Sequence, residues 1–360
     1  MFTDKLHERI TALNEAHLFS GVVQLQQADK VLFQQAYGFA HRGWAIANRL
    51  DTRFRVASVS KMFTAVAILQ LIEAGQLAFT TRVVEALGLA DTQIPPEVTV
   101  EHLLTMTAGI ADWFEESGDA EANWAALLRE QPIYLLRKHQ DYLPLFAYKA
   151  PLAGVGETYQ YSNASYLLLG LLIEQVTGLA YEEYVRQQIF QKIGMTRSDF
   201  LSLDGVDAEV AEGYLPVKAE NDVLIGWKKN IYMATPEGAA DGGATSTAAD
   251  LILFSQALHK HLLLTPALTS AMLTPKVLVT PERVGGYIWK YSYAQQFMLD
   301  EQEQIIRYGH TGEEEGISCR FFHYPQQMLD VVILGNQTDC AGRLGREIHD
   351  LIVGEKASYE

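Results

Sequence analysis

The sequence contains few cysteines, few basic residues and no long apolar run. Its two cysteines, Cys319 and Cys340, are too few for a disulfide framework or a cysteine-rich metal site. The segment around Pro325 has the pattern of a hairpin. In such a hairpin Cys319 would face roughly Val332 or Ile333, counting back from the turn. Cys340 would lie beyond the paired strands, so we expect two free thiols.

The shortage of basic residues restricts the possible partners. The chain has 28 lysines and arginines against 44 aspartates and glutamates, which gives a formal net charge of −16. Nucleic acids and anionic membrane surfaces bind basic faces, so this excess of acid argues against both as partners. The expected partner is a small-molecule or peptide substrate, and the sequence leaves the oligomeric state open.

No apolar stretch is long enough to cross a membrane. The nearest is a predicted helix over residues 57–74, and it carries Lys61. The first 19 residues are amphipathic, with scattered acidic residues, and do not resemble a signal peptide. We therefore expect a cytoplasmic protein, or a periplasmic one if a leader precedes this sequence.

Other common features are missing as well. The chain has no internal repeat and no Gly-x-Ser-x-Gly motif of an α/β-hydrolase. His259 and His261 are two residues apart near a predicted helix end, which is a poor spacing for a metal, and we expect both to face solvent. We expect neither a metal nor another cofactor.

What is present indicates an α+β fold. Hydrophobic residues make up 48% of the chain and charged residues 20%, which is a globular composition. Strand patterns occupy both ends of the sequence and helical patterns fill the middle. We predict an antiparallel sheet lobe from residues 1–75 and 276–360, flanked by the terminal helices, and an inserted all-helical lobe from residues 76–275. The active site is expected in the cleft between the lobes.

The segment "RVASVSKMFTAVAILQLIEAG" reads as an almost entirely apolar helix that ends at Gly75. Ser58 and Lys61 are three residues apart near its start, so they share one face. Apolar surroundings lower the pKa of a lysine, and a neutral lysine can take a proton from a serine hydroxyl. The alternative is a chance pair whose lysine extends to solvent.

Two further motifs lie downstream. Tyr161 and Asn163 occur in "QYSNASYLLLG", at a turn before a predicted helix that breaks near Thr177. Tyr161 could relay a proton and Asn163 could bind a substrate carbonyl; taken alone, they read as a half-buried tyrosine and a helix N-cap. His310, followed by Thr311 and Gly312, is placed at the end of a late strand, where glycine would let a substrate backbone approach.

The three motifs together resemble those of the serine penicillin-recognising enzymes. Ser-x-x-Lys, Tyr-x-Asn and His-Thr-Gly each occur once and in this order. That group includes class C β-lactamases, D-alanyl-D-alanine peptidases, and the esterases and D-aminopeptidases that share their fold. The resemblance covers most of the chain, and the predicted sheet with inserted helices is similar to that group's architecture.

The resemblance implies a role for each residue. Ser58 would be the acylated nucleophile, Lys61 its proton acceptor or electrostatic partner, and Tyr161 a general base or acid. Asn163 would bind the substrate amide. The strand of His310, Thr311 and Gly312 would form one wall of the site. The oxyanion would be held by the backbone N–H groups of Ser58 and Glu313.

These roles imply a serine hydrolase that cleaves an ester or amide, such as a β-lactam, a D-amino-acid peptide or a small ester, through an acyl-Ser58 intermediate. The alternative is a penicillin-binding-type sensor that becomes acylated without turnover.

Two positions depart from the pattern of the resembling enzymes. Class C β-lactamases usually have lysine where this chain has His310, and histidine is only partly charged near neutral pH. Glu313 stands where a small or hydroxyl residue is common, and its carboxylate would repel a substrate carboxylate. We therefore expect neutral esters or amine-bearing peptides to suit the site better than penicillins. The alternative is that the Glu313 side chain points to solvent and only its backbone matters.

Overall fold

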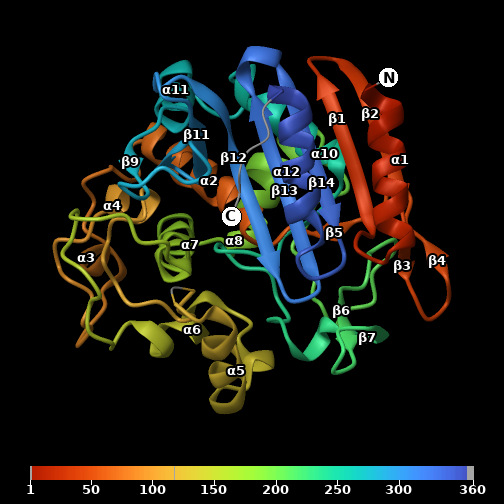
Figure 1. The fold of residues 1–360 in the computed structure, drawn as a ribbon. Helices are drawn as coiled ribbons and strands as arrows, with labels where there is room; N and C mark the ends of the chain where they lie inside the picture. Colours follow the sequence, from red (N-terminus) through yellow and green to blue (C-terminus); the bar gives the residue numbers. More distant parts are fainter. Residues whose placement is uncertain (1, 117, 355–360) are drawn as a thin grey trace.

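The computed structural model describes residues 2–116 and 118–354; residues 1 and 355–360 of the predicted sheet lobe lie outside the described part. One sheet of eight strands, in the order β2-β1-β14-β13-β12-β11-β10-β9, joins the two ends of the chain. All its neighbouring strands are antiparallel. Figure 1 shows the N-terminal strands and the C-terminal strands side by side in this sheet. The predicted α+β architecture is confirmed.

The strands of the large sheet are β1 (Gly21–Gln27), β2 (Lys30–Tyr37), β9 (Val277–Leu278), β10 (Ile288–Ser292), β11 (Gln295–Leu299), β12 (Ile305–Glu314), β13 (Ile317–Tyr324) and β14 (Leu329–Gly335). Three further strand pairs are β3 (Phe39–His41) with β4 (Ile46–Ala47), β5 (Phe54–Arg55) with β8 (Thr245–Ser246), and β6 (Tyr214–Lys218) with β7 (Leu224–Lys229).

The helices are α1 (Phe2–Glu15), α2 (Lys61–Glu73), α3 (Val83–Leu87), α4 (Val100–Leu104), α5 (Ala120–Glu130), α6 (His139–Phe146), α7 (Asn163–Thr177), α8 (Tyr181–Val185), α9 (Gln191–Ile193), α10 (Ala248–His259), α11 (Pro266–Met272) and α12 (Cys340–Val353). Short helical turns are η1 (Ala57–Ser60), η2 (Ile133–Leu135), η3 (Arg186–Phe190), η4 (Asn230–Tyr232) and η5 (Pro325–Gln327).

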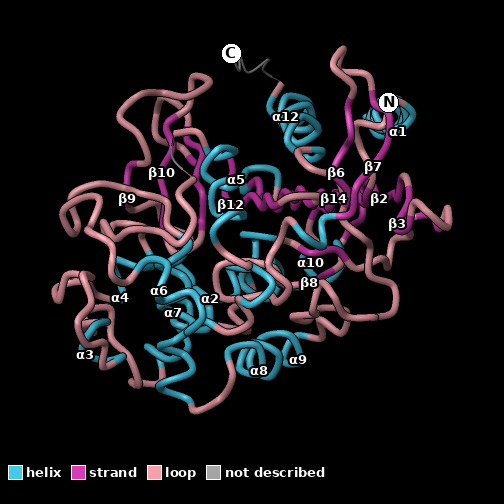
Figure 2. Tube along the Cα trace, turned by 90° about the horizontal axis from the view of Figure 1, so that it is seen from below, coloured by secondary structure: helices cyan, strands magenta, loops and turns pink. Residues whose placement is uncertain are grey.

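The sheet is covered on both faces because the side chains of each strand point alternately to one face and the other. Val23 and Ile333 are register partners and pack with α1 and α12 in one apolar core, whereas Val22 and Leu334 belong to a second core on the opposite face. Figure 2 shows α1 and α12 on one side of the strands and α10 and α2 on the other. The predicted packing of the terminal helices on one face is therefore observed.

The hairpin of β13 and β14 has a different register from the predicted one. Cys319 pairs with Leu334, not with Val332 or Ile333. The reason is the turn, which uses a helical turn after Tyr324 and ends at Met328 with a left-handed φ of 49°. Both cysteines are free, as predicted, and the structure shows that both are buried.

The middle of the chain is not all helical, which corrects the prediction for residues 76–275. It contains β6 and β7, which pair around a turn that includes Asp222, and β8, which pairs with β5. In addition, α10 packs against β1 and β14. The boundaries of the two lobes stay a prediction.

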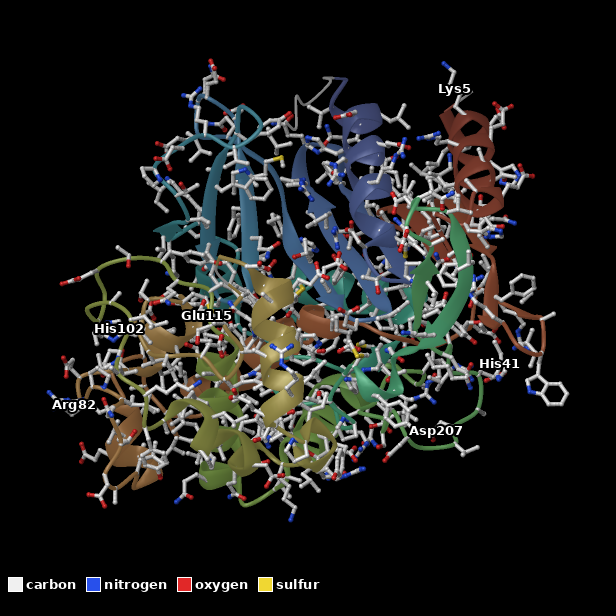
Figure 3. All side chains as sticks on the ribbon, turned by 60° about the horizontal axis from the view of Figure 1, so that its bottom comes forward. Lys5, His41, Arg82, His102, Glu115 and Asp207 are labelled. Atoms are coloured by element: carbon white, nitrogen blue, oxygen red, sulfur yellow. The ribbon has the colours of Figure 1, made fainter. Side chains whose placement is uncertain are left out.

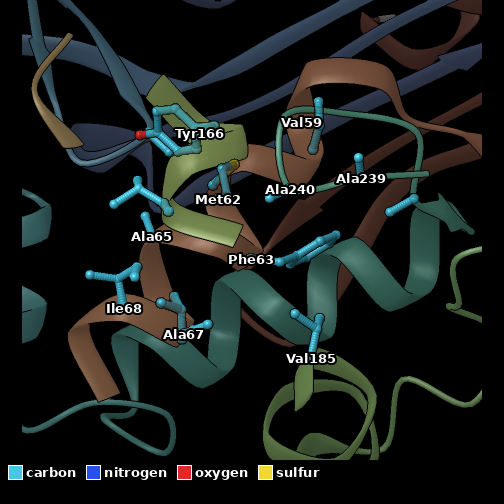
Figure 4. Close-up of a cluster of buried hydrophobic side chains, with 14 of the residues drawn as sticks. Val59, Met62, Phe63, Ala65, Ala67, Ile68, Tyr166, Val185, Ala239 and Ala240 are labelled. Atoms are coloured by element: carbon cyan, nitrogen blue, oxygen red, sulfur yellow. The ribbon is translucent and has the colours of Figure 1, made fainter. Parts of the chain in front are cut away.

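The apolar segment after Val56 is the centre of the larger core. It begins as the turn η1 and becomes α-helical only at Lys61; α2 ends at Glu73, and Gly75 follows with a φ of 70°. Figure 4 shows its Val59, Phe63 and Ile68 side chains among other buried apolar groups. Burying each such side chain contributes about 1.5–3 kcal/mol. The segment that carries Ser58 and Lys61 is thus anchored in the larger core.

Charged side chains lie mostly outside these cores. Figure 3 shows Lys5, Arg82 and Asp207 pointing away from the protein, and all three are exposed. Within the described residues, no single helix has both the length and the hydropathy that crossing a membrane requires. The helical segments α7 and Tyr181–Ile193 reach that length and hydropathy only together, and the chain bends between them.

Candidate active site

The predicted Ser58 and Lys61 meet at the junction of η1 and α2. Lys61 Nζ lies 3.0 Å from Ser58 Oγ. Ser58 is half-buried, whereas the Lys61 side chain has no exposed surface. The preceding Ala57 has a left-handed φ of 44°, which is uncommon for a residue with a side chain. Ser58 is therefore partly exposed to solvent, whereas the amine beside it is not.

The Lys61 amine has three oxygen neighbours. Besides Ser58 Oγ, Nζ donates to Asn163 Oδ1 at 2.7 Å and to the Asp241 carbonyl. Burial lowers the pKa of Lys61, and the carboxyls of Asp241, Glu116 and Asp112 oppose this effect. The lowered pKa gives Lys61 the capacity to accept a proton.

The Tyr161 side chain completes the contact with the serine. Its hydroxyl donates to Ser58 Oγ at 2.9 Å, and its ring lies with the centroid 5.0 Å from Lys61 Nζ. Burial, followed by the charge of Glu116, raises the pKa of Tyr161 well above its usual range. Tyr161 is therefore a phenol rather than a phenolate, and this favours the acid over the base of its two predicted roles.

Asn163 is the first residue of α7 and is buried. Its Oδ1 accepts from Lys61, and its Nδ2 donates to Glu116 Oε1 at 2.7 Å, so one N–H of the amide group remains for a substrate. Asn163 is not the N-cap considered as its alternative role, because Ser162 Oγ accepts from the N–H of Ser165 and caps α7.

A buried carboxyl holds the backbone at this point. Asp112 accepts from the N–H groups of Asn163 (2.6 Å), Ala164 (2.8 Å) and Trp113 (2.7 Å). Burial raises the pKa of Asp112 to about 7, against the effect of these three donors. Asp112 thereby fixes the start of α7 next to Lys61.

The strand β12 brings His310 to the same place. His310 is fully buried, its ring centroid lies 6.3 Å from that of Tyr161, and its Nδ1 lies 2.6 Å from the Thr311 carbonyl. Nε2 faces the Tyr291 hydroxyl at 3.4 Å. Burial, followed by the charge of Lys61, lowers the pKa of His310 to about 3. The imidazole is therefore neutral near neutral pH, where the sequence suggested partial charge.

Thr311 and Gly312 contact neighbouring parts of the fold. Thr311 Oγ1 accepts from Gln296 on β11 at 3.3 Å. A Cβ on Gly312 would lie 2.3 Å from the Val56 carbonyl oxygen. Glycine is thus required by the close approach of the protein's own chain, not only by a substrate backbone as the sequence suggested.

Glu313 does not point its carboxylate at the site, and this corrects the expected repulsion. Its Oε1 accepts from Ser318 Oγ at 2.8 Å and from the Arg320 guanidinium, both on β13. Successive residues of a strand face opposite sides, so with Gly312 against Val56, Glu313 faces away. Only the backbone of Glu313 stays near the site.

The sequence did not reveal Glu116, Asp112 and Asp241, which come from segments outside the three motifs. Within residues 2–116 and 118–354, no three His, Cys, Asp or Glu side chains are arranged to hold a metal ion. The absence of a metal stays a prediction.

Comparisons with known proteins identify the family of the chain. The family model described as Beta-lactamase matches residues 6–352. Penicillin-binding protein 4* of Bacillus subtilis is 27% identical over 342 residues, which cover 91% of this chain and 70% of that protein. Esterase EstB of Burkholderia gladioli is 33% identical over 233 residues, which cover 63% of this chain and 57% of EstB.

Solved structures give the same result. A penicillin binding protein from Bacillus halodurans superposes with a TM-score of 0.83 at 33% identity, over 95% of this chain and 98% of that chain. The chain therefore belongs to the Beta-lactamase family, whose members are usually serine hydrolases and include penicillin-binding proteins and esterases.

Proposed function

We propose that this protein is a serine hydrolase that cleaves an ester or amide through an acyl intermediate on Ser58. One observation carries the proposal: Ser58 Oγ lies 3.0 Å from Lys61 Nζ and 2.9 Å from the Tyr161 hydroxyl. A nucleophilic hydroxyl next to a buried amine and a phenol is the arrangement that acyl transfer needs.

The proposed reaction has two stages. Ser58 Oγ attacks the substrate carbonyl carbon while Lys61 accepts the hydroxyl proton, and the backbone N–H groups of Ser58 and Glu313 stabilise the oxyanion. When the tetrahedral intermediate collapses, the Tyr161 phenol protonates the leaving group and is reprotonated from Lys61. Water then hydrolyses the acyl-enzyme by the reverse route.

The preferred substrates are neutral or carry an amine rather than a carboxylate. The sequence predicted this preference from the Glu313 carboxylate, but that carboxylate faces away from the site. Two other groups support the same preference. His310 is neutral and offers no positive charge to a substrate carboxylate. The carboxylate of the exposed Glu116 accepts a hydrogen bond from Asn163 and adds a negative charge beside the substrate amide site. Exposed charges at 4 Å interact by about 1 kcal/mol in water, a factor of about five in rate.

Intact-mass spectrometry tests the acyl-enzyme. The wild type and Ser58→Ala are exposed to D-alanine 4-nitroanilide, its N-acetyl derivative, a neutral 4-nitrophenyl ester and a cephalosporin. We expect an acyl adduct and turnover in the wild type and no adduct in Ser58→Ala. An adduct of one equivalent that never turns over would indicate the sensor instead.

The same panel tests the substrate preference. We expect the free amine to be favoured about fivefold over its N-acetyl derivative, and this ratio to fall towards one in Glu116→Gln. Glu301→Gln serves as the control, because Glu301 is an exposed carboxylate that pairs with Arg283 and lines no part of the site. A higher kcat/KM for the cephalosporin than for the ester would refute the preference.

A further inference from the structure

A cavity of about 230 Å³ lies outside the site described above. Its lining includes His139, Glu174, Gly238 and Ala239, and none of the candidate site residues. Residues 239–241 separate it from Lys61, because the Asp241 carbonyl at the end of this segment accepts from Lys61 Nζ. The cavity thus borders the support of the catalytic amine.

His139 connects the cavity to that support. Its side chain is 4% exposed, its Nε2 accepts from the Ala240 N–H at 3.0 Å, and its Nδ1 lies 3.0 Å from Glu174 Oε1. A backbone N–H can only donate, so Nε2 carries no proton and Nδ1 donates to Glu174. These contacts require the neutral ring in one tautomer.

The Ala240 peptide is held from the other side by α2. Thr64, one turn after Lys61, donates its Oγ1 to the Ala240 carbonyl at 2.6 Å. The Tyr181 hydroxyl lies 2.7 Å from Thr64 Oγ1 and donates to it, and the Tyr181 ring packs edge-on against His139 with centroids 5.1 Å apart. Figure 4 shows Ala240 close to the side chains of α2.

On the side of α7, this segment and His139 are tightly packed. A Cβ on Gly170 of α7 would lie 2.6 Å from both His139 Nε2 and Ala240 Cβ. The imidazole therefore fills the space between α7 and residues 239–241 and supplies the acceptor for a buried N–H. Without that acceptor the N–H would be unpaired, and the segment would have to move to reach water.

We infer that His139 is a positioning residue: through the Ala240 N–H it fixes residues 239–241, so that the Asp241 carbonyl meets Lys61 Nζ in line with Ser58. This role rests on the proposed function. Displacements of about 1 Å at distant supports can cost about a hundredfold in rate. We therefore expect His139→Ala to lower kcat between about tenfold and a hundredfold with KM nearly unchanged.

Two matched variants separate positioning from bulk stability. Glutamine has a carbonyl that can accept from Ala240 and an amide group that can donate to Glu174, so His139→Gln should keep most of the wild-type kcat. Glu182→Gln changes another residue of the same cavity that has no hydrogen bond to His139, and its kcat should equal that of the wild type.

Chemical rescue gives a readout that a purely structural role would not produce. Removing the His139 ring enlarges a cavity that can already admit a small molecule, so added imidazole should restore part of the kcat of His139→Ala. The same imidazole is added to the wild type and to Ser58→Ala, to subtract its own reaction with the ester. If His139→Ala does not fold, Thr64→Val removes the opposite hydrogen bond, and the same kcat loss is expected.

The outcomes are distinguishable. A folded His139→Ala with wild-type kcat, or a His139→Gln as impaired as His139→Ala with no imidazole rescue, would overturn the positioning role alone. A wild type that forms no adduct on Ser58 would overturn the proposed function and this inference together.

Discussion

Replacing Gly312 by alanine tests whether β12 supplies part of the reaction machinery. A Cβ at this position would lie 2.3 Å from the Val56 carbonyl oxygen, about 1 Å short of the 3.4 Å at which ordinary contact begins. The next neighbours, the Val56 carbonyl carbon at 3.2 Å and the Ala57 Cβ at 3.3 Å, are also tight. Since the obstacle is backbone, it cannot rotate away, and either β12 or η1 must shift.

The shift has a calculable consequence because the predicted oxyanion donors sit on both sides of this contact. The N–H of Glu313 follows Gly312, and the N–H of Ser58 follows the Val56–Ala57 segment. Such donors act at 2.7–3.1 Å, so a displacement of about 1 Å removes most of the benefit of one of them. We expect kcat to fall by about a hundredfold to a thousandfold, which is about 3–4 kcal/mol of transition-state stabilisation.

The assay is steady-state hydrolysis of a neutral 4-nitrophenyl ester, together with thermal unfolding to show that the variant folds. Overpacking of this kind costs about 1–3 kcal/mol of stability, which a stable protein survives. Gly226→Ala is the matched control: Gly226 lies in β7, has no positive φ, and a Cβ there meets nothing within 4 Å. A folded Gly312→Ala that hydrolyses the ester at the wild-type rate would refute the assignment of β12 to the oxyanion site.

Three further predictions follow from the buried titratable groups. Burial raises the pKa of Asp112 to about 7, and the protonated carboxyl holds the N–H of Asn163 less well. The kcat/KM should therefore fall as the pH drops through this value. The Asp112→Asn variant should be slower than the wild type, and its pH profile should lack this limb. Burial lowers the pKa of His310 to about 3, so His310→Asn should leave the shape of the kcat/KM profile between about pH 5 and 8 unchanged. A lost limb would contradict the neutral imidazole. Burial raises the pKa of Cys319 and of Cys340, the latter to about 12, so a thiol reagent should label neither in the native protein and both in denaturant; rapid native labelling would contradict their burial.

The sequence predicted correctly those features of the fold that depend only on residues close together in the chain. The spacing of Ser58 and Lys61 was enough to place both side chains on one side of a helical segment, and the observed distance of 3.0 Å agrees with it. The sequence also predicted the stop at Gly75, because a left-handed glycine ends a helix wherever it lies in the fold.

The alternation of side chains along a strand can be read from the sequence, and it would have predicted the direction of the Glu313 side chain. If Gly312 faces the serine segment, the next residue must face away, and Glu314 must face the segment again. The structure follows this rule: Glu314 pairs with the buried Arg55 at 2.7 Å, whereas Glu313 pairs with Arg320. The hypothesis of a repelling carboxylate was wrong because it considered the charge of Glu313 and not the face of the strand. The alternative, a Glu313 side chain that points away from the site, agrees with the structure.

Contacts between distant segments could not be predicted. Asp241 and Asp112 lie far from the motifs in sequence, and no spacing rule connects an aspartate to a lysine 180 residues before it. Asp112 is brought near Lys61 because it binds the start of α7, which packs against α2. Asp241 is brought there by the segment before β8, whose backbone bonds to Val56 and Ala57. Glu116 belongs to the same class of residues, and its electrostatic effect on Lys61 was visible only in the fold.

The distribution of charge around the site explains how a neutral or cationic preference can arise without the Glu313 carboxylate. Lys61 is the one basic side chain in direct contact with Ser58 among the described residues, and its charge is disfavoured by burial. His310, the histidine of the His-Thr-Gly strand, is held neutral by burial. A substrate carboxylate would therefore meet no stable positive charge and one exposed acid, Glu116. In the proposed function, discrimination against carboxylates would follow from the neutral imidazole on β12 more than from the carboxylate of Glu116 beside Asn163. On this reasoning His310→Lys is expected to improve kcat/KM for the cephalosporin relative to the neutral ester, and an unchanged ratio would contradict it.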